Sequence, residues 1–268
     1  MNINRDETYS EILKLEELLS LQQPKTSTID DRLFIIIHQV CELCFSQILV
    51  EITDLHYKFK IDASAGDIVN KCARIVALFD TVSDWLNILK TIKIHEFCTF
   101  ILNYKVASGA QSFQYHLIEE KLGFTKMAGA QTQNLNTATG KLEHETLREE
   151  VLRYIQRNYM GSLCHDSENY QQQRLVDFLM SIIRDTVDYS DALTVVDSLI
   201  NLDEAMDTWR IQHLRIAQRM IGQKSIGTGG TMDRSGLHKT LNRRLFPEFL
   251  EARAKLRCET LNYSPSGL

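Results

Sequence analysis

His213 lies on a helical apolar stripe that leads directly into a glycine-rich segment. The stripe comprises Leu202, Met206, Trp209, His213, Ile216 and Met220, and residues 221–230 read Ile-Gly-Gln-Lys-Ser-Ile-Gly-Thr-Gly-Gly. A neutral imidazole that projects into an apolar pocket can hold haem iron, and a glycine loop beside it can close over a substrate. The same pattern is more often that of a histidine packed into a core. The stripe alone therefore does not establish a ligand.

Bulk composition favours a small-molecule or protein partner. The chain has 268 residues, a formal net charge of -5 and a pI near 5.9. A length of this order can form one large domain. Nucleic acid and anionic membrane surfaces are disfavoured as partners because the chain has no broad positive field.

The six cysteines are expected to be reduced thiols, since no secretory signal precedes them and a cytoplasmic location is therefore predicted. They are Cys41, Cys44, Cys72, Cys98, Cys164 and Cys258. The first two have the spacing of half a zinc site, but they lie in a helical pattern without a second pair, which favours buried apolar packing. No stretch of about 18 or more uncharged apolar residues is found, so no membrane-spanning helix is expected.

Apolar residues recur at steps of three and four, and there are only three prolines, which predicts an all-α protein. We expect a single helical domain over residues 1–268, with a helical insertion at about 123–200. Residues 123–142 are expected to form a surface connection, and the outer face of the last helix, with His238, Lys239, Arg243 and Arg244, is expected to be solvated. The expected helices cover about 7–21, 30–58, 65–91, 94–104, 111–122, 142–159, 170–202 continuing through His213 to Gly222, and 236–257.

Four segments, in order along the chain, together resemble the tryptophan 2,3-dioxygenase family. The first segment comprises residues 18–22, 31–39 and Glu42-Leu43, and the second is 108–115, Ser-Gly-Ala-Gln-Ser-Phe-Gln-Tyr. The third comprises residues 202–205 and Trp209-Arg-Ile-Gln-His213. The fourth comprises residues 219–222, Lys224 and Gly227-Thr-Gly-Gly. The similarity spans about residues 9–122 and 145–256. It implies an enzyme that uses haem b and O2 to open an indole ring, with O2 inserted at the C2–C3 bond.

The resemblance also implies roles for individual residues. His213 would be the axial ligand of the haem iron, and His38 would be a catalytic histidine that faces the substrate on the opposite side. Phe34, four residues before His38 on the same helix, would pack against the substrate ring. His38 and Phe34 could instead be plain core residues, and Thr228 could serve only the turn chemistry of its loop.

Further substrate contacts are implied at positions of the family pocket. They are Tyr9, Phe97, Phe100, Ile101, Ser108, Gly109, Thr228 and Arg234. The family is typically a homotetramer in which the N-terminal helix reaches a neighbour's pocket, and the same is expected for Tyr9 here.

The sequence departs from the family at the carboxylate site. Ile101 stands where the family carries an arginine, and Phe97 stands where it carries a tyrosine. Isoleucine offers no donor, so a substrate carboxylate there would be desolvated and unpaired. We therefore expect an indole-type substrate without a free carboxylate, either indole, an alkylindole, a tryptamine-like amine or a carboxyl-modified tryptophan, unless Arg234 or Lys105 replaces the missing arginine.

Two other functions remain open at this point. A haem monooxygenase would retain one oxygen atom and give an oxindole or a hydroxylated ring. A non-catalytic haem protein would bind the cofactor without a substrate, but it would have no need for a histidine at position 38.

Overall fold

The computed structural model describes residues 7–104, 111–124, 145–160, 168–222 and 243–261. Within these ranges the regular elements are helices and no strand occurs. The all-α prediction is therefore confirmed. The organisation as one domain with an insertion at about 123–200 stays a prediction.

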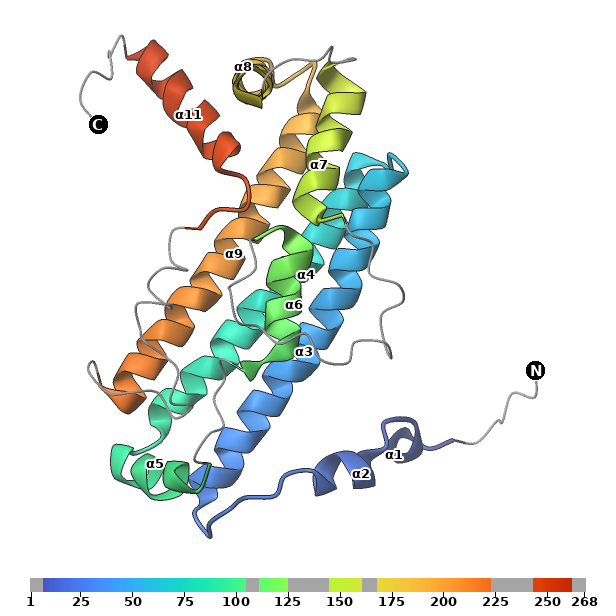
Figure 1. Cartoon of the computed structure of the whole chain (residues 1–268). Coiled ribbons are helices and arrows are strands. Elements are labelled where there is room, and N and C mark those ends of the chain that lie inside the picture. Colours follow the sequence, from blue (N-terminus) through green and yellow to red (C-terminus); the bar gives the residue numbers. More distant parts are fainter. Residues whose placement is uncertain (1–6, 105–110, 125–144, 161–167, 223–242, 262–268) are drawn as a thin grey trace.

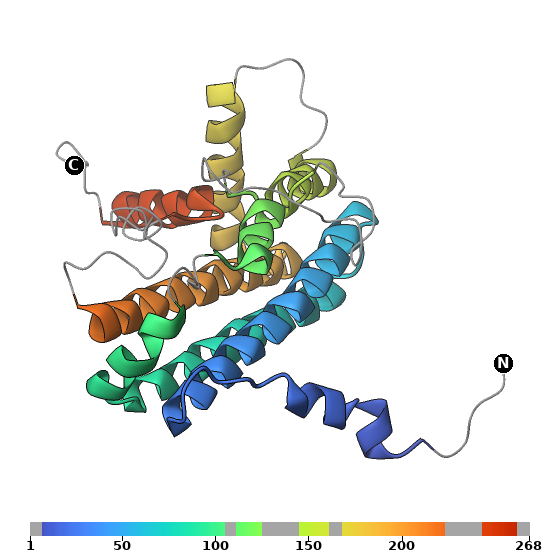
Figure 2. The same ribbon diagram turned by 60° about the horizontal axis from the view of Figure 1, so that its bottom comes forward.

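Three long helices form the body of the protein: α3 (Ile29–Lys60), α4 (Ala65–Ile88) and α9 (Ser190–Ile221). Helix α4 packs against both α3 and α9, and the three run side by side in Figures 1 and 2. Their facing sides are apolar and fully buried, as at Ile52, Phe79 and Met206. Burial of these side chains is the main favourable term that holds the three helices together.

Shorter helices cover the long ones. Helices α6 (Phe113–Leu122) and α7 (Leu147–Ile155) lie on α3, and the π-helical turn η4 (Gln156–Met160) extends α7. Helices α8 (Glu168–Arg184) and α11 (Pro247–Thr260) pack against each other at one end. At the other end, η1 (Leu89–Thr91), α5 (Ile94–Ile101) and η2 (Leu102–Tyr104) turn the chain from α4 back toward the start of α3.

Three predicted helices differ from the structure. The expected helix at 7–21 is two short ones, α1 (Tyr9–Ile12) and α2 (Leu15–Ser20), because Lys14 adopts a left-handed conformation with φ 51°. The expected continuous helix from 170 is broken after Arg184, where the Asp185 side chain accepts from the backbone N–H groups of Val187 and Asp188.

The last helix begins at Pro247, later than expected, with proline in its first turn. Arg243 and Arg244 precede it and are partly exposed, so the prediction that they lie on the face of this helix is wrong. Arg244 forms an ion pair with Asp207 at 3.3 Å, and the Arg243 carbonyl accepts from Arg210 at 3.4 Å. His238 and Lys239 lie outside the described residues.

Helix α3 is long and apolar enough, by length and composition alone, to cross a membrane. Its most apolar part, residues 33–50, contains one charged residue, Glu42, so the helix does not contradict the sequence expectation that no uncharged apolar stretch of about 18 residues occurs. Helices α4, α6 and α7 pack against α3, and its buried Glu51 pairs with Lys71 at 2.6 Å. These contacts explain its apolar composition as that of a core helix.

Candidate functional site

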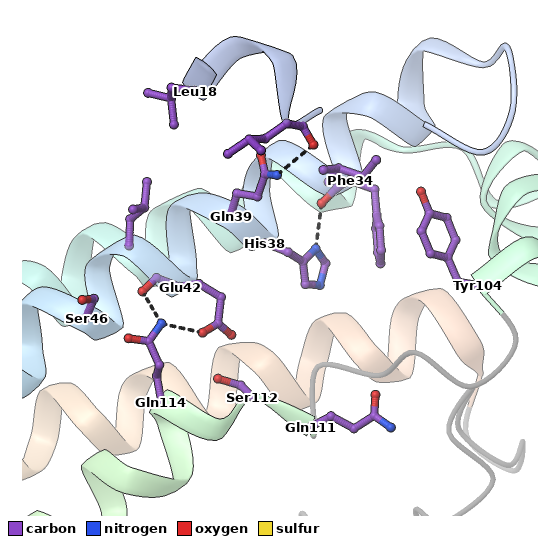
Figure 3. A pocket seen from close by; sticks show the side chains of 13 residues that line it. Leu18, Phe34, His38, Gln39, Glu42, Ser46, Tyr104, Gln111, Ser112 and Gln114 are labelled. Carbon is purple, nitrogen blue, oxygen red and sulfur yellow. Dashed lines mark hydrogen bonds between the residues drawn. The ribbon is translucent and has the colours of Figure 1, made fainter. Parts of the chain in front are cut away.

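Helix α3 places Phe34 and His38 one turn apart on its inner side, with ring centroids 4.2 Å apart. The Nδ1 atom of His38 lies 2.7 Å from the Phe34 carbonyl oxygen (Figure 3). A carbonyl oxygen only accepts, so Nδ1 carries the proton and Nε2 of the neutral ring is left with a lone pair. Burial lowers the pKa of His38 below its ordinary value and outweighs the opposing effects of this bond and of Glu42. His38 is therefore suited to accept a hydrogen bond from an N–H group.

An open cleft of about 680 Å³ adjoins this helix. Helices α2, α3 and α6, the segment after α2, and Tyr104 and Gln111 supply its described lining (Figure 3). The lining residues are Leu18, Leu21, Phe34, Ile35, His38, Gln39, Glu42, Leu43, Ser46, Tyr104, Gln111, Ser112 and Gln114. The cleft thus combines an aromatic surface with a few polar groups, as ligand sites commonly do.

The predicted substrate residues of α5 lie behind Phe34. Ring centroids of Phe97 and Phe100 are 6.2 Å and 5.5 Å from that of Phe34, and both side chains are buried. Ile101 packs, partly buried, against the same apolar core. None of these three is among the described residues that line the cleft. In the described chain they form the apolar wall that holds the Phe34 ring in place.

Of the other predicted substrate residues, the structure describes Tyr9 alone, and Tyr9 is not among the described residues that line the cleft. Tyr9 lies on α1 with 74% of its surface exposed, and α1 and α2 project from the helical body in Figure 1. Ser108, Gly109, Thr228 and Arg234 lie outside the described residues, as does Lys105. Their roles stay predictions.

The sequence interpretation missed several polar cleft residues, among them Tyr104, Gln39 and Gln114. Gln114 Nε2 donates to the Glu42 carboxylate at 2.9 Å and to its backbone carbonyl at 2.8 Å, which joins α6 to α3. Glu42 and Gln114 occur in segments that carry the family resemblance, so the resemblance could have indicated that they belong to the site. Nothing in the local sequence marks Tyr104, because its partner is far away in the chain.

His213 lies on α9 with its ring stacked on Trp209, at a centroid distance of 5.2 Å and an interplanar angle of 14°. Part of its surface is open, but protein atoms surround the imidazole and this desolvation lowers its pKa to about 4. Protonation of His38 would lower it further, because the two imidazoles are close enough to interact electrostatically. His213 is consequently neutral at pH 7, and no hydrogen bond to its ring nitrogens occurs in the described chain.

A buried polar network fixes the residues around His213. The Arg210 side chain, 2% exposed, donates to the Tyr115 hydroxyl at 3.2 Å and to the Glu119 carboxylate at 3.0 Å. The Tyr115 ring lies 4.3 Å from Trp209, which in turn stacks on His213. The Trp209 Nε1 atom is buried, with no hydrogen-bond partner among the described residues. This network couples α6 to α9 directly beside the candidate ligand.

Two other groups of candidate metal ligands are accounted for by their surroundings. Burial raises the pKa of the Cys41 thiol to about 12, which disfavours the thiolate that zinc binding requires. Glu145 and Glu150 lie close to His56, but Arg153 bridges their carboxylates at 2.6 Å and 3.1 Å. The Arg153 guanidinium already neutralises the carboxylate charge that a metal cation would otherwise bind.

The donor set fits haem. A neutral imidazole without a hydrogen bond can bind iron, and an aromatic stack on one side with a second histidine nearby provides an apolar surrounding for a porphyrin. The arrangement therefore fits the class of helical haem proteins.

The chain belongs to the tryptophan 2,3-dioxygenase family, whose model matches residues 2–153 and 148–256. It is 31% identical over 263 residues to tryptophan 2,3-dioxygenase of Caulobacter vibrioides, a match that covers 94% of this chain and 99% of the relative. The enzyme of the same name from Shewanella woodyi is 30% identical over 275 residues, covering 95% and 92% of the two chains. The family is haem-dependent and uses O2 as a co-substrate, so the chain is a haem-dependent dioxygenase by class.

The neutral state of His213 predicts a pH dependence of stability in the haem-free protein. The folded pKa of about 4 lies below the ordinary 6.5, so the unfolded chain binds this proton more readily. The stabilising contribution of the neutral His213 ring is fully present above pH 6.5 and is lost as the pH falls toward 4. Relative to His213→Leu, the wild type should lose on the order of 2 kcal/mol of unfolding free energy between pH 7.5 and 4.5, measured by urea denaturation.

His95→Leu is the matched control, since the His95 side chain is 77% exposed. Its unfolding free energy should follow that of the wild type at both pH values. Equal pH dependence in wild type and His213→Leu would contradict a neutral buried His213.

Proposed function

We propose that this protein is a haem-dependent oxygenase that inserts both atoms of O2 at the C2–C3 bond of an indole-type substrate, with haem b held by His213. The observation that carries the proposal is the pair of neutral imidazoles, His213 on α9 and His38 on α3, beside an aromatic cleft. Bound haem would supply the O2 chemistry, and the protein would supply orientation and desolvation.

His213 is the proposed axial ligand because its ring is neutral, carries no competing hydrogen bond in the described chain and is held by Trp209. A ligating imidazole must offer a deprotonated nitrogen, and a low pKa ensures this at neutral pH. His213 would hold the haem as its protein ligand, and the haem would supply the O2 chemistry.

Replacing this ligand should abolish normal haem binding. We expect His213→Ala, purified and mixed with haem, to lose the wild-type Soret spectrum, whereas His95→Ala should retain it. An unchanged haem spectrum in His213→Ala would contradict the assignment. Far-ultraviolet circular dichroism of both variants would show whether the helices remain folded.

His38 is the proposed catalytic group that orients the substrate. Its Nε2 lone pair would accept the indole N–H, while Phe34 would pack against the substrate ring. Fixing the ring in this way aligns C2 and C3 with the site of oxygen chemistry. A carrier without a substrate would not need such an acceptor.

The substrate proposed here lacks a free carboxylate. Ile101 provides no donor, and the described lining of the cleft contains Glu42 but no lysine or arginine. A carboxylate in this surrounding would be desolvated without a cation. Arg234 and Lys105, the potential replacements, lie outside the described residues.

A panel of substrates tests this proposal. With haem-loaded protein, indole, tryptamine and tryptophan amide should be turned over at least tenfold more efficiently than free tryptophan, a ratio that corresponds to about 1.4 kcal/mol. Mass spectrometry with ¹⁸O2 should find two labelled atoms in the product. One labelled atom would indicate a monooxygenase, no oxygen consumption would indicate a non-catalytic haem protein, and efficient turnover of tryptophan alone would refute the substrate proposal.

We also propose a homotetramer in which Tyr9 completes the substrate site of a neighbouring subunit. Helices α1 and α2 bury none of their residues within the chain. Their apolar side chains are exposed, for example Ile12 and Leu19 at 62% each. Contiguous exposed apolar surface is typical of a protein interface.

A cytoplasmic location stays a prediction.

Deletion of the first 15 residues tests the role of this arm. The truncated protein should bind haem with an unchanged spectrum but lose at least nine tenths of its turnover, because each substrate site would lack the neighbour's contribution. Light scattering would report the subunit number. Full activity in a monomer would contradict the proposal.

A further inference from the structure

A tyrosine and a buried carboxylate form a hydrogen-bonded pair at one side of the cleft. The Tyr104 hydroxyl donates to Asp31 Oδ1 at 2.5 Å. The other oxygen of Asp31 accepts from the backbone N–H of Thr26 at 2.7 Å and from its hydroxyl at 2.9 Å. Asp31 is fully buried in the first turn of α3, where the helix dipole favours an anion.

This arrangement fixes the direction of the Tyr104 proton. Burial alone would raise the pKa of Asp31, but hydrogen bonds from Tyr104 and Thr26 hold that pKa below its ordinary value. An ionised carboxylate only accepts, so the phenolic proton points to Asp31. The Tyr104 oxygen also interacts with the backbone N–H of Lys25, which leaves it one further lone pair, and donation to an anion makes it a stronger acceptor.

The position of Tyr104 brings this acceptor to the substrate surface. Its ring centroid lies 5.9 Å from that of Phe34, and the His38 centroid lies 4.2 Å from the same ring. Figure 3 shows the Phe34 ring between His38 and Tyr104. An aromatic ligand on Phe34 would therefore have His38 on one side and Tyr104 on the other.

The charges around the cleft have one sign. Glu42 and the Asp31 carboxylate behind Tyr104 are acidic, and no lysine or arginine is present in the described lining. Such a surface attracts a cation and repels an anion.

We propose that Tyr104, held by Asp31, determines specificity by accepting a hydrogen bond from the ammonium group of the substrate. This inference rests on the proposed indole site and narrows its substrate class to indolic amines. Tyr104 would thus contribute a polar contact beside the apolar side chains of α5.

Binding of three ligands that share an indole ring tests the proposal. Tryptamine carries an ammonium group, 3-ethylindole is neutral, and indole-3-propionate is an anion. Calorimetry on the haem-loaded full chain should rank their affinities in that order. Tyr104→Phe should weaken tryptamine binding about tenfold, the change expected for loss of one hydrogen bond to a charged group, and leave 3-ethylindole within about twofold.

Asp31→Asn provides a second, opposite test. The amide oxygen would face the N–H of Thr26, so the amide N–H would face Tyr104 and turn the phenolic proton toward the cleft. Tryptamine should then bind more weakly, and indole-3-propionate should bind more tightly than to the wild type. Tyr57→Phe is the matched control, because Tyr57 is exposed and lies on α3, the helix that carries Asp31. This variant should leave all three affinities unchanged.

The outcomes separate this inference from the proposed function. Equal affinity for tryptamine and 3-ethylindole in the wild type, or an unchanged tryptamine affinity in Tyr104→Phe, would overturn the role of Tyr104 while indole binding remained. Failure of all three ligands to bind haem-loaded protein would overturn both the indole site and the inference. A Soret spectrum recorded for each variant would confirm that haem is bound in every titration.

Discussion

The stack of Tyr115, Trp209 and His213 depends on the buried ion pair between Arg210 and Glu119. This pair joins α9 to α6. The ring centroids of Trp209 and of Phe45 on α3 lie 5.5 Å apart. Buried charges are costly unless paired, so removal of either partner would leave the other uncompensated in the core. The requirement to keep Arg210 and Glu119 together therefore constrains the rotation of α9, and with it the direction in which His213 faces.

Desolvation then sets the chemical state of both histidines. Burial is the largest influence on the pKa of His38 and of His213, and in each it favours the neutral ring. The two rings differ in what engages their nitrogens. His38 donates a hydrogen bond from Nδ1 to a carbonyl oxygen, whereas the His213 ring stacks on Trp209 and its nitrogens have no hydrogen-bond partner among the described residues. The same apolar surroundings thus keep both imidazoles neutral, in the state that the proposed roles of His38 as an acceptor and of His213 as a ligand require.

Periodic patterns predicted most of the helices, because α3, α4 and α9 each keep an apolar stripe at helical spacing over many turns. They failed where one residue changes the backbone, as at Lys14 and Asp185, since a left-handed residue or a side-chain turn leaves the apolar pattern intact. The sequence indicated His38, Phe34 and His213 through the family resemblance. It could not indicate contacts such as Tyr104 with Asp31 or Arg210 with Glu119, which join residues 73 and 91 positions apart.

The apolar side chains of α5 and the acidic groups of the cleft both disfavour a substrate carboxylate. Phe97, Phe100 and Ile101 surround Phe34 with side chains that offer no polar group. A carboxylate placed there would lose its hydration without gaining a partner, whereas an aromatic ring gains contact area. Among the polar groups of the cleft, the Nε2 atom of His38, the Tyr104 oxygen and Glu42 accept hydrogen bonds, while the amides and hydroxyls of Gln39, Gln111, Ser46 and Ser112 can also donate. The three acceptors favour a ligand with donors at both ends of an aromatic ring system, which an indole bearing an amine supplies and an indole bearing only a carboxylate does not.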